Sequence, residues 1–111
     1  MDEERARELL RTERAEVLQA LDNTLAAGRA DRAAGAELGD EADPGRALTD
    51  EATDDAVAAS LRERLAVLER AEQRLAQGTY GKSVRSGLPI PDERLEADPA
   101  AELTVEEARR R

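Results

Sequence analysis

Carboxylates are the side chains best suited to chemistry in this chain, which contains no cysteine and no histidine. Without these two residue types it lacks imidazole bases, thiol nucleophiles, disulfides and cysteine ligands for zinc. Two carboxylates, Asp40 and Asp43, lie close together in the segment Asp40–Gly45. Such a pair can accept hydrogen bonds from basic and polar groups of a partner. Asp, Pro and Gly are also the ordinary residues of a turn, so both interpretations stay open on composition alone.

No arrangement in the sequence is typical of an enzyme. There is no nucleophile beside a base, no glycine-rich phosphate loop and no cluster of metal ligands. The net charge is −9 and aromatic residues make up 1% of the 111 residues. Affinity for nucleic acids comes mainly from Lys and Arg on phosphates. We therefore expect no enzymatic activity, no cofactor and no direct nucleic-acid contact, but a partner with a basic protein surface.

Two amphipathic helices must position the acidic segment. The first is predicted over residues 2–34, because apolar residues recur there at spacings of three, four and seven. Its stripe is Leu10, Val17, Leu18, Leu21 and Leu25. The second is predicted from an N-cap at Thr49 to Gln77, with Gly78 as its stop. Its stripe is Val57, Leu61, Leu65, Leu68 and Leu75.

Neither stripe is wide enough to bury itself alone. The predicted arrangement is therefore an antiparallel two-helix coiled-coil hairpin over residues 1–78, with a tip loop at about 35–48. The narrow seam also allows a second copy to join, so we expect a monomer or a weak homodimer. No run approaches the roughly 20 apolar residues of a membrane span, and the first residues lack a signal-peptide pattern. We expect no membrane contact and a cytoplasmic location.

A third region over residues 79–111 follows the hairpin. Its glycines and prolines oppose a long helix, whereas Thr104 and Glu107 fit a capping box that opens a short C-terminal helix. A small apolar cluster is expected around Tyr80. Its predicted members are Leu88, Ile90, Leu95, Leu103 and Val105. The fold class predicted for the whole chain is mainly α.

Two segments of the third region, residues 78–90 (GTYGKSVRSGLPI) and residues 94–100 (RLEADPA), carry recognisable motifs. They resemble the G-T-Y-G-x-C-x-x-C-G-x-x-I signature and the R-L-E-A-x-P-x-A segment of the DksA/TraR family of regulators that bind RNA polymerase. Residues 103–107 occupy the place of its second C-x-x-C pair. Residues 40–45 (DEADPG) resemble the acidic D-x-x-D-x-A motif at the tip of the family's coiled coil, with Gly45 in place of Ala.

The chain departs from the family at all four zinc-ligand positions. The resemblance places Ser83, Ser86, Thr104 and Glu107 where the family has cysteines. Structural zinc needs thiolate or imidazole ligands, and a single carboxylate is a poor site for a hard cation. We therefore expect no metal and a degenerate, metal-free zinc-finger-like region held by hydrogen bonds. The alternative is that this region is only partly ordered.

The resemblance implies a transcription regulator without DNA contact. The hairpin would enter the secondary channel of RNA polymerase and bring Asp40, Asp43 and Gly45 towards the active site. Arg62, Arg64 and the third region would dock outside the channel. The alternative is a coiled-coil interaction protein or structural homodimer that has lost polymerase binding.

Some family members also help to bind the alarmone ppGpp. The corresponding positions here are Ser60, Arg64, Val67 and Ala108. Only Arg64 is basic, so we predict no ppGpp binding of the familial kind.

Overall fold

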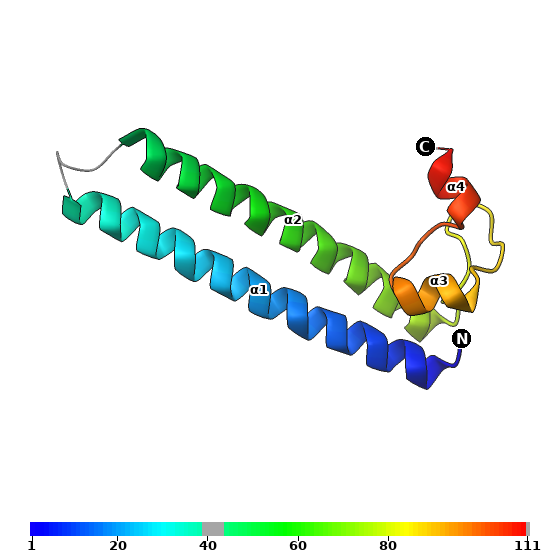
Figure 1. Ribbon diagram of the computed structural model, residues 1–111. Helices are drawn as coiled ribbons and strands as arrows, with labels where there is room; N and C mark the ends of the chain where they lie inside the picture. Colours follow the sequence, from blue (N-terminus) through cyan, green and yellow to red (C-terminus); the bar gives the residue numbers. More distant parts are fainter. Residues whose placement is uncertain (39–43, 111) are drawn as a thin grey trace. The chain divides into compact units, whose positions relative to one another are not determined.

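Four helices make up most of the structure, which is a computed structural model. It describes the backbone of residues 1–38 and 44–110, and the side chains of residues 1–30, 33 and 52–110. Within these ranges the helices are α1 (Glu3–Leu38), α2 (Pro44–Gln77), α3 (Asp92–Ala97) and α4 (Val105–Arg109) (Figure 1). The only β pairing in the described backbone is an isolated bridge between Lys82 and Pro89. The predicted mainly α fold is confirmed.

The chain divides into two compact units, each containing parts of both long helices. The first unit comprises Met1–Ala15 and Ala66–Arg111, and the second comprises Glu16–Leu65. In each unit a segment of α1 lies beside a segment of α2 and runs in the opposite direction, as predicted for the hairpin (Figure 1). None of the described helices is long and apolar enough to cross a bilayer.

Both long helices extend further into the segment predicted as the loop 35–48. The first continues to Leu38, and the second begins at Pro44 rather than at Thr49. Gly35 costs a helix only about 1 kcal/mol relative to Ala, and its neighbours are mostly alanines. Proline suits the first helical position because its missing N–H needs no partner there. These two properties account for the longer helices.

The buried residues of the two long helices in the first unit are leucines and alanines. Leu10 and Leu68 are 1% and 0% exposed, and Ala6 and Ala71 are both 0% exposed. The small alanine side chains let the helices approach closely, and each buried leucine contributes roughly 1.5–3 kcal/mol. Leu75 is buried as well. The predicted leucine stripes therefore form the seam here.

In the second unit, one residue of each of two neighbouring apolar pairs, 17–18 and 57–58, is buried and the other is exposed. Val17 and Ala58 are buried, whereas their neighbours Leu18 and Val57 are 46% and 43% exposed. Consecutive helical residues point about 100° apart, so only one of two neighbours can face the other helix. The prediction that Leu18 and Val57 belong to the seam is wrong for this reason.

The end of α2 is a glycine-capped turn. Gly78 has a φ of 78°, in the left-handed region that favours glycine. The amide of Thr79 donates to the carbonyl of Arg74 at 2.9 Å, and the amide of Gly78 donates to that of Leu75 at 3.3 Å. These two bonds form a Schellman motif. The predicted stop at Gly78 is confirmed.

The finger region, residues 79–110, has its own small core. Ile90, Leu95 and Ala101 form a buried cluster, with Met1 and Tyr80 packed against it. Leu103 is also buried, but Leu88 and Val105 are 58% and 39% exposed. Leu88 sits in a tight turn, and α4 buries none of its residues. Leu88 and Val105 therefore do not belong to the cluster as predicted, and Leu103 is buried but is not one of its members.

Candidate functional site

The four residues that the resemblance aligns with zinc ligands, Ser83, Ser86, Thr104 and Glu107, lie in two local structures of the finger region. Ser83 and Ser86 belong to a tight turn, in which the amide of Ser83 donates to the carbonyl of Leu88 at 2.8 Å. The amide of Gly87 donates back to the carbonyl of Ser83 at 2.9 Å, and Gly87 has a φ of 77°. Only glycine adopts that backbone conformation without strain. The turn therefore depends on Gly87 for its shape.

Ser83 is the centre of this turn. Its side chain is 4% exposed, and its hydroxyl oxygen accepts hydrogen bonds from the amides of Arg85 at 3.1 Å and Ser86 at 3.2 Å. The same hydroxyl donates to Oε2 of Glu107 at 2.9 Å. The buried hydroxyl thus has partners for its donor and its acceptor functions, as buried polar groups require.

Thr104 and Glu107 form the predicted capping box at the start of α4. The amide of Glu107 donates to Oγ1 of Thr104 at 3.2 Å, and the amide of Thr104 donates to Oε1 of Glu107 at 3.1 Å. Each bond satisfies an amide that has no partner within the helix. The capping-box prediction is confirmed.

The Glu107 carboxylate joins the two local structures. One oxygen accepts from Ser83 and the other from the amide of Thr104. The hydrogen bond from Ser83, followed by those from Thr104 and Ser86, lowers the pKa of Glu107 from 4.5 to about 2. Hydrogen bonds that stabilise the charged form have this effect. The carboxylate is therefore ionised at any physiological pH.

These four residues fit a hydrogen-bonded junction and not a metal site. They offer three neutral hydroxyls and one carboxylate, whereas structural zinc takes thiolate or imidazole ligands. Among the described residues, no three His, Cys, Asp or Glu side chains converge as a metal site would need. The bonds of Glu107 run to groups of the protein itself.

Two arginines of α2 form ion pairs with Glu102, a residue next to the junction. Arg70 binds the carboxylate of Glu102 through two nitrogens, at 2.9 and 3.3 Å, and Arg74 approaches it at 3.7 Å. The backbone carbonyl of Glu102 accepts from the amide of Val84 at 2.9 Å. Glu102 therefore ties the turn of Ser83 to the last turns of α2.

Two further hydrogen bonds join a side chain of the finger region to a backbone carbonyl elsewhere in the same region. The hydroxyl of Tyr80 donates to the carbonyl of Pro99 at 2.6 Å, and burial raises the pKa of Tyr80 to about 12. Nε of Arg94 donates to the carbonyl of Leu103 at 2.8 Å. Sequence analysis missed these contacts and the Arg70–Glu102 pair, because their partners are far apart along the chain and follow no local pattern.

Of the three predicted tip residues, the structure describes only the backbone of Gly45. Asp40 and Asp43 lie outside the described residues, and Gly45 lies in the first turn of α2. The predicted docking residues Arg62 and Arg64 both lie on α2 within the second unit. The role of these residues stays a prediction.

Of the comparisons with known proteins, the one with solved structures supports the fold. No family model matches the chain. Over 65 residues the chain is 48% identical to General stress protein 16O of Bacillus subtilis (strain 168), a match that covers 59% of this chain and 40% of that protein. The chain therefore spans less than half the length of this curated relative. The structure of transcription factor DksA2 from Pseudomonas aeruginosa is similar, with a TM-score of 0.85 and 26% identity over 97% of this chain and 81% of that chain.

Proposed function

Because this chain is a DksA-like protein without a single cysteine, we propose that it regulates transcription by binding RNA polymerase with a metal-free finger. The observation that carries this proposal is the TM-score of 0.85 to a transcription factor over 97% of the chain. The hairpin enters the secondary channel of the polymerase. The protein does not contact DNA directly.

The acidic tip is the acting part in this proposal. Asp40 and Asp43 lie between Leu38 and Pro44, where the two long helices end and begin. Carboxylates carried there can accept charge-assisted hydrogen bonds from basic groups near the active site of the polymerase. The net charge of −9 favours a basic protein surface over a polyanion such as DNA.

Binding to purified core RNA polymerase tests the proposal. The full chain would be immobilised and incubated with core enzyme, with and without an established channel-binding competitor. Retention of the polymerase that falls as the competitor rises supports binding in the secondary channel. Failure to retain polymerase at micromolar protein contradicts the proposal, and retention that the competitor does not affect contradicts the channel as its location.

A second candidate function rests on two exposed apolar side chains. Leu18 and Val57, both in the second unit, are 46% and 43% exposed. Such side chains favour a coiled-coil interaction protein or a homodimer that has lost polymerase binding. Sedimentation of the wild type and of a Leu18→Ser, Val57→Ser variant distinguishes the two. A dimer that the variant abolishes, together with no polymerase binding, would favour this second function.

A further inference from the structure

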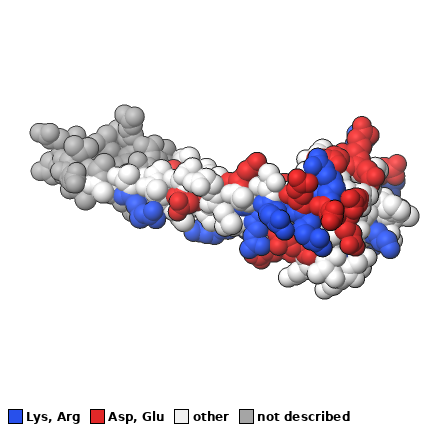
Figure 2. Space-filling view, turned by 90° about the horizontal axis from the view of Figure 1, so that it is seen from below, with Lys and Arg blue, Asp and Glu red and all other residues white. Residues whose placement is uncertain are grey.

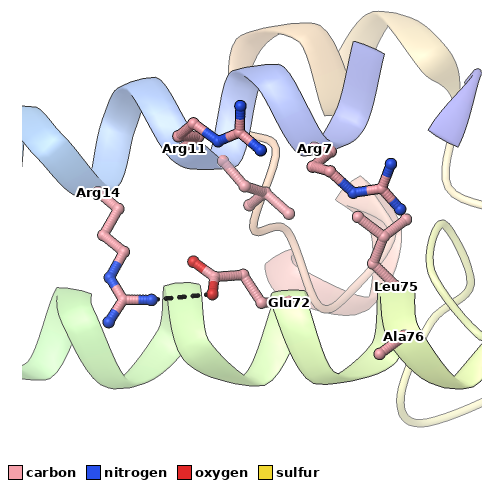
Figure 3. Close-up of a pocket in the computed structure, with 7 residues that line it drawn as sticks. Arg7, Arg11, Arg14, Glu72, Leu75 and Ala76 are labelled. Carbon is pink, nitrogen blue, oxygen red and sulfur yellow. Dashed lines mark hydrogen bonds and ion pairs between the residues drawn. The ribbon is translucent and has the colours of Figure 1, made fainter. Parts of the chain in front are cut away.

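A hollow in the first unit is lined by three arginines of α1. Its volume is about 330 Å³, and its walls are Arg7, Leu10, Arg11 and Arg14 of α1 with Glu72, Leu75 and Ala76 of α2 (Figure 3). We call it the arginine pocket. Arg7, Arg11 and Arg14 are spaced by four and three residues, so they share one face of the helix over about 10 Å of its length.

Positive charge in the arginine pocket exceeds negative charge. Arg14 pairs with Glu72 at 3.0 Å, which leaves Arg7 and Arg11. Neither of these two has a hydrogen bond or an ion pair with another residue in the described part of the chain. In the face shown in Figure 2, groups of basic side chains lie beside acidic ones. The pocket is thus locally cationic in a chain whose net charge is −9.

Arg7 and Arg11 lie one turn apart on α1 and repel each other. Glu3 and Glu4 precede Arg7 by four and three residues and Glu8 precedes Arg11 by three, whereas across the seam only Arg14 pairs with a carboxylate. A bound anion would remove this repulsion.

The chemistry of the walls selects the class of anion. Guanidinium groups bind phosphate oxygens through two parallel hydrogen bonds. The floor of Leu10 and Leu75 is apolar but offers no aromatic ring, so a nucleobase would find nothing on which to stack. A volume of about 330 Å³ lies at the lower end of small-molecule sites. The carboxylate of Glu72 on the facing wall repels anions and so limits the charge of an anion that the pocket can bind.

We propose that the arginine pocket binds a small phosphate-bearing anion, held by Arg7 and Arg11. The anion is either an inorganic diphosphate or the phosphate ester of a short aliphatic molecule. This inference is independent of the proposed polymerase binding, because the pocket is complete within the first unit.

Calorimetric titration of the full chain at low ionic strength tests the site. Inorganic pyrophosphate and glycerol phosphate serve as probes, and the tighter binder identifies the source. Saturable binding with one site per chain is expected for at least one of them. Removing one guanidinium should weaken binding about tenfold or more, since a hydrogen bond to a charged group contributes about 1.5–3 kcal/mol. Arg7→Gln with Arg11→Gln should therefore weaken it roughly a hundredfold.

A matched variant controls for net charge. Arg29→Gln with Arg85→Gln removes the same charge from exposed arginines that do not line the pocket, and it should bind within about twofold of the wild type. Circular dichroism of every variant checks that the helices are intact. Absence of saturable binding to both probes overturns the proposal, as does an equal loss in the two double variants.

A variant expected to bind more tightly provides a further test, because partial unfolding would weaken binding and not strengthen it. Glu72→Gln removes the carboxylate that faces the site and releases Arg14. It should bind the same probe several-fold more tightly than the wild type. Unchanged or weaker binding by this variant would overturn the assignment of the anion to this pocket.

Discussion

The hydroxyl of Ser83 donates a 2.9 Å hydrogen bond to Oε2 of Glu107, a residue 24 positions further along the chain. This bond joins the tight turn of the finger region to the capping box of α4. The resemblance to the DksA/TraR family aligns both positions with zinc-ligand cysteines. A hydrogen bond and a helix cap therefore stand where a metal ion would otherwise join the same two segments. Its contribution can be measured on several variants.

The first prediction concerns the buried hydroxyl itself. Ser83→Ala removes the acceptor for the amides of Arg85 and Ser86 and the donor to Glu107. Leaving buried polar groups without partners costs about 1–3 kcal/mol, so we expect the free energy of unfolding to fall by that amount in urea titrations. Ser60→Ala, at an exposed position of α2, is the control and should change it by less than about 0.5 kcal/mol. Equal effects would argue against the network.

The second prediction concerns acid stability. The pKa of Glu107 is lowered to about 2 in the folded protein from an ordinary value of 4.5. A lowered pKa stabilises the fold above the unfolded value, and the stabilisation is lost as pH falls from about 4.5 towards 2. The difference in stability between wild type and Glu107→Gln should therefore shrink over that range. A carboxyl titration followed by NMR measures the pKa directly, and a midpoint near 4.5 would contradict the network.

The third prediction concerns metal. Chelation with EDTA should leave the Tm of the wild type unchanged, because the junction consists of protein hydrogen bonds. A four-cysteine variant should behave in the opposite way, with one zinc per chain by elemental analysis and a Tm that falls on chelation. The changes are Ser83→Cys, Ser86→Cys, Thr104→Cys and Glu107→Cys. A wild type that purifies with stoichiometric zinc would contradict the prediction.

The fourth prediction tests the seam. Leu68 is 0% exposed, and Leu68→Ala should lower the free energy of unfolding by about 2–5 kcal/mol through lost burial and a cavity. Leu18 is 46% exposed, so the substitution Leu18→Ala makes the same chemical change at the surface and serves as the control. Leu18→Ala should cost clearly less, about 1 kcal/mol or below. Similar costs at both sites would place Leu18 in the seam.

The fifth prediction concerns the acidic tip. Asp40→Asn with Asp43→Asn should alter transcription by the polymerase in vitro while leaving helix content and polymerase binding nearly unchanged. The reason is that the change removes two carboxylates without removing their volume. Asp22→Asn with Asp55→Asn, at exposed helical positions, changes the net charge equally and should have no effect. Identical behaviour of the two variants would argue against an active tip.

Local patterns made the helices and their caps predictable. Thr104 and Glu107 are three residues apart, so the capping box is contained in a short stretch of sequence and was found there. Gly78 is equally local. The choice between Val17 and Leu18 was not predictable, because both fit an apolar stripe and the neighbouring helix decides which one is buried. The beginning of α2 at Pro44 was missed because Pro44 and Gly45 are also ordinary turn residues.

Hydrogen bonding at the junction was predictable from the residue types, but the pairs of residues that form the bonds were not. Hydrogen bonding by Ser83 and Glu107 could be expected from their types, but their contact spans 24 residues and depends on the turn of the finger region. The pairing of Arg70 with Glu102 spans 32 residues and leaves no periodic trace. Contacts of this kind are set by tertiary packing, which a single sequence does not display.

We expect the contacts of Glu102 to couple the unfolding of two segments of the first unit. Its carboxylate is held by Arg70 and Arg74 of α2, and its carbonyl by the amide of Val84 in the finger region. Loss of the last turns of α2 would remove the anchor of that segment, so the two should open together. Hydrogen exchange in residues 70–77 and in residues 83–104 should then report one shared opening free energy, as members of a single foldon.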